Sequence, residues 1–162
     1  MILGLSTDAF TQLHVAISLL GLASGLLVAV GLCTNRPLPA STALFLATTV
    51  LTSATGFLFP SKMIGPPHVV GAISLVVLFV AIVALYNFEL RGRWRAVYVI
   101  GALLGFYLNA FVAVVQAFQK IPALHALAPN GSEPPFAATQ LILLLLFVAT
   151  GVLAYRRFRP TG

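Results

Sequence analysis

Three histidines, His14, His68 and His125, are the side chains of this sequence best suited to chemistry. Imidazole binds copper, zinc and haem iron, and it exchanges a proton near neutral pH. Asp8 and Glu133 could complete a metal shell. No two of the histidines have the His-x-x-x-His spacing that places both rings on one helix face. The three histidines are therefore a candidate metal or haem set, and each one alone also fits an interfacial role without a ligand.

Polar amides recur at helical spacing in the second half of the chain. Asn109, Gln116 and Lys120 follow Gly101 and Gly105 at steps of about four residues. An amide exposed to lipid has no hydrogen-bond partner, so such a stripe faces protein or water. Each amide alone is also explained by a hydrogen bond that fixes helix packing. As a set they predict the wall of a pocket for a small ligand, a metal ion or a quinone headgroup. The candidate ligand-binding residues are His14, Ser18, Ser53, His68, Asn109, Gln116, Gln119, Lys120 and Gln140.

The composition places these residues in a membrane. Of 162 residues, 60% are hydrophobic and only 7% are charged, whereas soluble domains carry about 25% charged residues. The net charge of +6 comes from basic residues at the ends of apolar runs, without interleaved aromatics, which does not favour nucleic-acid binding. One cysteine, Cys33, excludes an intrachain disulfide. No phosphate-binding loop or HExxH motif occurs, and enzymatic activity stays open.

Five apolar runs are long enough to cross a bilayer as helices, which takes about 20 residues. Proline, glycine and charged residues separate the runs. The second run is rich in Ser and Thr, whose hydroxyls can bond back to their own backbone, so we expect it to span as well. The sequence thus predicts an all-α integral membrane protein, one domain over residues 1–162, with five transmembrane helices in a single bundle. The predicted spans are 11–32, 41–59, 68–88, 95–119 and 137–156.

The basic residues predict the orientation. With the N-terminus outside, seven of the nine Lys and Arg residues fall on the inner side, and only Lys62 and Lys120 stay outside. This satisfies the positive-inside rule for an N-out, C-in topology. The stretches "LNAFVAVVQAFQKIPALHALAP" and "SEPPFAATQLILLLLF" resemble small multi-pass bacterial membrane proteins. That resemblance implies a bacterial inner membrane and no particular activity.

On this topology all three histidines belong to the outer side, while the inner halves of the spans are almost wholly apolar. The glycine pairs Gly21/Gly25 and Gly101/Gly105 have the spacing that allows close helix approach. We expect the inner halves to pack tightly and the outer halves to separate around a polar pocket. Three functions fit: a binding or redox subunit, a transporter or channel working as a homo-oligomer, and an accessory subunit. In the last two, the glycine pairs would contact other subunits.

Overall fold

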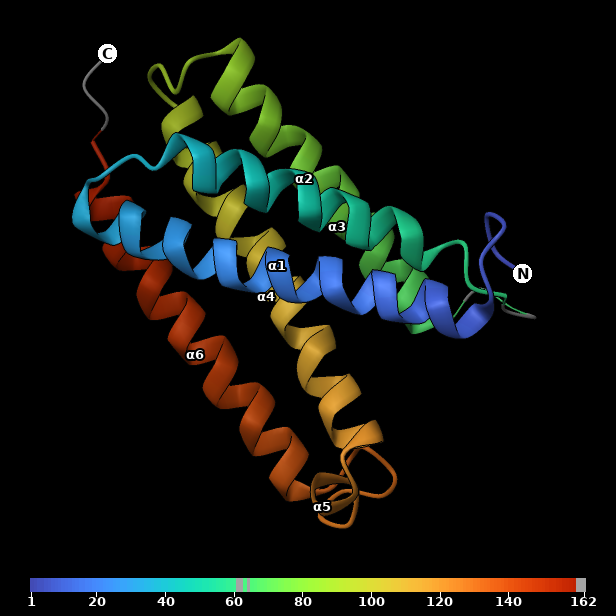
Figure 1. Cartoon of the computed structure of the whole chain (residues 1–162). Helices are drawn as coiled ribbons and strands as arrows, with labels where there is room; N and C mark the ends of the chain where they lie inside the picture. The colour runs from blue at the N-terminus through green and yellow to red at the C-terminus, as the bar shows by residue number, and fades with distance from the viewer. Residues whose placement is uncertain (61–62, 64, 160–162) are drawn as a thin grey trace.

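The computed structural model describes residues 1–60, 63 and 65–159, and it is an all-α bundle of six α-helices (Figure 1). Lys62, counted above among the outer charges, lies outside the described residues. Five of the helices are long and cover the five predicted apolar runs, whereas α5 is a single turn. The elements are α1 (Thr7–Thr34), α2 (Pro39–Gly56), α3 (Pro66–Ile82), the π-helical segment η1 (Val83–Asn87), α4 (Trp94–Lys120), α5 (Pro122–His125) and α6 (Pro134–Arg157).

The helix ends follow local sequence rules. The Ser6 hydroxyl caps α1 by accepting a hydrogen bond from the Ala9 amide at 3.2 Å. Proline occupies the first turn of α2, α3 and α6, where its missing N–H costs nothing. Asn35 ends α1 in the left-handed conformation with φ 55°, which asparagine adopts more readily than most residues. The helices therefore begin and end close to the positions that the prolines in the sequence predict.

Four of the helices are long and apolar enough to cross a membrane: α1, α3 with η1, α4 and α6. The predicted fifth span, α2, is not among them. Seven of its 18 residues are Ser or Thr, which lowers its mean hydropathy. Length and composition therefore support a multi-pass membrane protein with four spans, and the role of α2 depends on how it packs.

The sequence predicts one regular helix for the third apolar run, but the structure shows an irregular end. After Ile82 the helix widens into the π-helical turn η1, and the chain then reverses through Glu89, Leu90 and Gly92, which all have positive φ. Phe88 and Trp94 stack across this reversal with ring centroids 3.8 Å apart. No residue type in the run marks a π-turn in advance.

Glycines let the helices approach closely within the chain. A Cβ on Gly25 of α1 would lie 2.7 Å from the Phe106 ring of α4, and one on Gly105 would lie 2.7 Å from Leu78 of α3. Gly101 faces Ala81 in the same way, at 3.0 Å. The prediction that these glycine faces contact other subunits is therefore wrong, because the chain's own helices already cover them.

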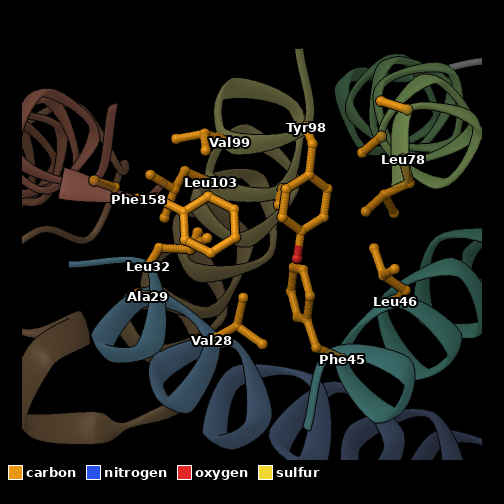
Figure 2. Close-up of a cluster of buried hydrophobic side chains, with 14 residues drawn as sticks. Val28, Ala29, Leu32, Phe45, Leu46, Leu78, Tyr98, Val99, Leu103 and Phe158 are labelled. Carbon is orange, nitrogen blue, oxygen red and sulfur yellow. The ribbon is translucent and has the colours of Figure 1, made fainter. Parts of the chain in front are cut away.

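A single apolar core lies where the helices cross (Figure 2). Tyr98 and Phe158 lie with ring centroids 6.2 Å apart, and the Tyr98 hydroxyl points toward Phe45 of α2. Phe158 follows α6, and the Arg95 guanidinium holds this segment by donating to the carbonyls of Tyr155 and Phe158. The C-terminal end of α6 is thereby fixed against α4.

The two ends of the bundle carry different residues. One end, here called the arginine end, contains Arg36, Arg91, Arg93, Arg95, Arg156, Arg157 and Arg159. The other, called the histidine end, contains His14, His68, His125 and Lys120. At the histidine end the helices divide: the start of α1 lies beside the end of α2, whereas α4 and α6 run away from them to α5 (Figure 1).

Candidate functional site

His14 is the best-positioned histidine. It lies half-buried on α1, and its Nδ1 is 2.8 Å from the Thr55 hydroxyl of α2. Thr55 donates its own proton to the Leu51 carbonyl at 2.7 Å, one turn back in α2. While Thr55 donates to Leu51, its oxygen can only accept from His14, which places a proton on Nδ1 of that ring. Nε2 is then left to accept a hydrogen bond, or to donate one when the ring is charged.

Aromatic rings hold the His14 ring in this orientation. The Phe59 ring packs edge-on against it with centroids 5.2 Å apart, and Phe10 packs on Phe59 at 5.1 Å. A Cβ on Gly56 would lie 4.0 Å from the His14 ring carbon, so α2 passes the imidazole at ordinary contact distance. Lys120, the last residue of α4, lies at the same end of the bundle.

A seam of polar groups continues from His14 toward the middle of the bundle. The Ser18 hydroxyl contacts Thr52 at 3.4 Å, and the Asn109 amide of α4 donates to the Ser18 carbonyl at 3.4 Å. Deeper still, the Thr49 hydroxyl is buried and has no hydrogen-bond partner among the described residues. Gly21 faces both Thr49 and Asn109, with 3.2 and 3.1 Å to a Cβ built there. Asn109 therefore meets α1 where α1 and α4 cross.

His68 and Ser53 lie on the other side of α2. The Ser53 hydroxyl donates to Ser74 of α3 at 3.0 Å. His68 Nδ1 accepts a hydrogen bond from the Gly65 amide at 3.2 Å, which caps the start of α3, and its ring packs against Phe57. This capping contact is a structural role of the kind that the proline-rich start of the run favours. His68 and Ser53 thus belong to the α2–α3 contact, away from the His14–Thr55 pair.

The remaining predicted residues are dispersed. Gln140 of α6 donates to the Phe111 carbonyl of α4 at 3.2 Å, and its buried Oε1 has no partner among the described residues. Gln116 and Gln119 are exposed on α4, and His125 is exposed on α5. Within the described part of the chain, no three His, Cys, Asp or Glu side chains converge on a position that could hold a metal ion. The metal set His14, His68 and His125 stays a prediction.

Two features could not be read from residue types alone. Thr55, which orients His14, is one of seven hydroxyl residues in α2, and only the rotation of the helix selects it. A cavity of about 150 Å³ lies at the arginine end, between α1, α2, η1 and α4. Tyr98 and Arg36 line it, although their positions in the sequence suggest only interfacial and orienting roles.

The fold and composition together define a small all-α, multi-pass membrane protein. No family model, curated protein or solved structure matches the chain.

Proposed function

We propose that α2 is a fifth membrane span. Contacts between α1 and α2 run antiparallel along their whole length, from Gly31 opposite Leu38 to His14 opposite Thr55. The end of α3 lies at the arginine end beside the end of α1, so α2 has to carry the chain back to the histidine end. Its 18 residues span about 27 Å as a helix, close to the thickness of a hydrocarbon core.

Several hydroxyls of α2 support this placement because they are satisfied inside the protein, although the buried Thr49 hydroxyl has no partner among the described residues. Thr48 and Thr55 donate to carbonyls one turn back in α2, and Ser53 bonds to α3. The low hydropathy of α2 therefore overstates its cost in lipid. By the positive-inside rule the arginine end faces the cytoplasm of a bacterial inner membrane, and the histidine end faces outward. A reporter fusion that places the C-terminus outside would contradict both the orientation and the outward site.

We further propose that the chain is a binding or redox subunit whose outward site takes the carbonyl headgroup of a lipid-soluble ligand, such as a quinone. The observation that carries this proposal is the His14–Thr55 hydrogen bond, which fixes the ring, while Nε2 has no hydrogen bond to any of the described residues. Lys120 adds a positive charge at this end of the bundle. Nε2 of the neutral ring can accept a hydrogen bond from a quinol hydroxyl, and once the ring is protonated Nε2–H can donate to a quinone carbonyl.

The direction of approach favours a ligand dissolved in the bilayer. Beyond the crossing at Gly25 and Phe106, α1 and α4 diverge toward the histidine end (Figure 1). Leu13 and Val15, which flank His14, are exposed, so a headgroup at His14 can keep its apolar tail in lipid. The amide of Asn109 marks the inner limit of this region, since it already bonds to the Ser18 carbonyl of α1.

The test is quinone binding by purified protein in lipid nanodiscs. We expect a short-chain ubiquinone or menaquinone analogue to bind, and His14→Ala to weaken binding about tenfold, the effect of roughly 1.4 kcal/mol. Thr55→Val keeps the side-chain volume but removes the acceptor that orients the ring, so it should also weaken binding. His68→Ala is the matched control, because it removes an imidazole from the other side of α2.

Equal binding by the wild type and His14→Ala would refute the site, as would the absence of quinone binding. Metal content of the same samples decides the alternative. Stoichiometric copper, zinc or haem that is lost in His14→Ala would assign the site to a metal and replace the quinone proposal.

A further inference from the structure

The cavity at the arginine end is built from segments that are distant in the sequence. It has a volume of about 150 Å³, and its lining includes Val28, Thr42, Leu85, Leu90, Tyr98 and Phe158. Apolar side chains dominate the wall, with the three hydroxyl residues Thr42, Tyr86 and Tyr98 among them. An apolar cavity of about this size in another protein takes up a benzene-sized molecule. The space therefore suits a short length of hydrocarbon.

One wall of the cavity has an unusual backbone. Leu85 belongs to the π-helical turn η1, and Leu90 has φ 61°, in the left-handed region that leucine rarely adopts. π-turns are rare and often occur at functional sites. The Leu90 amide donates to the Ala84 carbonyl at 3.1 Å, which ties the reversal to the π-turn. A regular helix end would place these side chains differently, so the local backbone shapes the wall.

One stretch of the cavity lining suits an anion. This stretch, here called the mouth, consists of Arg36, Pro37, Leu38 and Pro39. The Arg36 guanidinium is exposed, and no ion pair or hydrogen bond to it is found among the described residues. Arginine binds phosphate through paired hydrogen bonds.

The charge around the mouth points the same way. All seven arginines lie at this end, and the one ion pair found among the described residues joins Arg91 to Glu89. Arg95 is engaged with the carbonyls that end α6, so it is not free to bind a ligand. Arg36 is thus an unpaired cation placed directly beside an apolar cavity at the level where a membrane-spanning helix ends.

We propose that this cavity binds an anionic phospholipid, with the phosphate on Arg36 and part of an acyl chain inside the cavity. The pairing of an anion site with an apolar space selects an amphiphile over a free anion. A membrane supplies such molecules at the depth of the arginine end. The proposal does not depend on the quinone site, which lies at the opposite end of the bundle.

The experiment is native mass spectrometry of the detergent-solubilised protein, titrated with phosphatidylglycerol or with phosphatidylcholine of the same acyl chains. We expect phosphatidylglycerol to stay bound preferentially. Arg36→Gln should weaken its binding about tenfold, as expected for a lost charge-assisted contact to phosphate. Arg93→Gln is the matched control, because it removes the same charge from an exposed residue that does not line the cavity.

A second variant tests the cavity itself. Val28→Phe adds bulk from α1 into the space and leaves every charge in place, so it should weaken phosphatidylglycerol binding while the helical circular dichroism spectrum is kept. If Val28→Phe binds the lipid normally, no acyl chain enters and the proposal fails. Equal losses in Arg36→Gln and Arg93→Gln would indicate unspecific charge attraction and overturn it. Competition by inorganic phosphate alone, or equal binding of phosphatidylcholine, would overturn it as well.

Discussion

At the arginine end the termini of α1, α2, η1, α4 and α6 meet in one packed region, whereas at the histidine end the helices divide into two groups. Glycines explain much of this difference. Gly25, Gly101 and Gly105 allow close contact where the helices cross, and the buried side chains of Leu32, Tyr98 and Phe158 then fill the arginine end. Toward the histidine end, polar side chains and rings take the contact positions between α1 and α2 instead. Close packing therefore fixes the shape of one end, and a few hydrogen bonds fix the other.

The largest expected effect is at Gly31, near the arginine end. A Cβ there would lie 2.6 Å from the Arg36 carbonyl oxygen, a backbone atom that cannot rotate away. The Arg36 amide also donates to the Gly31 carbonyl, at 2.8 Å. This hydrogen bond keeps the Arg36 backbone close to Gly31, so it cannot easily move away from an added Cβ. We expect Gly31→Ala to lower the free energy of unfolding by about 2 kcal/mol, as for other overpacked sites.

Gly56→Ala is the matched control at the histidine end. The nearest atom to its Cβ would be 4.0 Å away, in ordinary contact. We expect no loss of stability there. Thermal unfolding of both variants in the same detergent measures the difference. Equal destabilisation by the two substitutions would show that packing at the two ends does not differ as described.

A double-mutant cycle within the histidine end separates the two histidines. His14 and Thr55 share a hydrogen bond, so His14→Ala and Thr55→Val should couple by about 0.6 kcal/mol, the mean found for hydrogen bonds between membrane helices. His14→Ala and His68→Ala should be additive, because His68 caps α3 through Gly65. Coupling between the two histidines in stability or ligand binding would instead support the shared site that is predicted from their common side of the membrane.

The arrangement of helices was largely predictable, because lipid leaves few alternatives. A run of about 20 apolar residues must satisfy its backbone internally, and prolines mark where each run stops. The sequence therefore places all five long helices. It misses η1, because a π-turn depends on packing at the end of α3 and carries no residue signature.

The candidate site was predictable only in part. The polar residues of α2 occur every few positions, so nearly any rotation of the helix brings some of them to α1. The sequence places Ser53 and His68 with His14, but the helix rotation puts Ser53 against Ser74 and leaves Thr55 for His14. A partner for Asn109 is foreseeable, because a buried amide needs one. Its identity, the Ser18 carbonyl, depends on where α1 and α4 cross.

A smaller effect is expected from Asn109 itself. Its hydrogen bond to Ser18 is long, at 3.4 Å, and leucine has a similar shape and volume. We expect Asn109→Leu to change the free energy of unfolding by less than about 0.5 kcal/mol, below the average for such bonds in membranes. Thermal unfolding in detergent measures this value. A loss of several times that size would mean that the amide, rather than the glycines, holds α1 against α4.

The smallest effect concerns the loop between α5 and α6 at the histidine end. The backbone N–H of Asn130 donates to Glu133 at 3.0 Å, and the Ser132 N–H and the Asn130 side chain donate as well. These donors favour the charged carboxylate and lower its pKa below the ordinary glutamate value, although the group is at the surface. A carboxyl group with a lowered folded-state pKa stabilises the loop above the ordinary pKa of about 4.3. That contribution is lost as the pH falls through the lowered value.

Hydrogen exchange of the Asn130 and Ser132 amides, corrected for the intrinsic exchange rate, should therefore show protection at neutral pH that weakens below about pH 4. In Glu133→Gln the protection should be smaller at neutral pH and independent of pH over this range. The His14–Thr55 contact should not respond to the substitution, because it lies in α1 and α2, beyond the point where the helices divide. If the substitution also changed exchange at the start of α1, the two groups of helices at this end would be coupled, and their separation would not hold in solution.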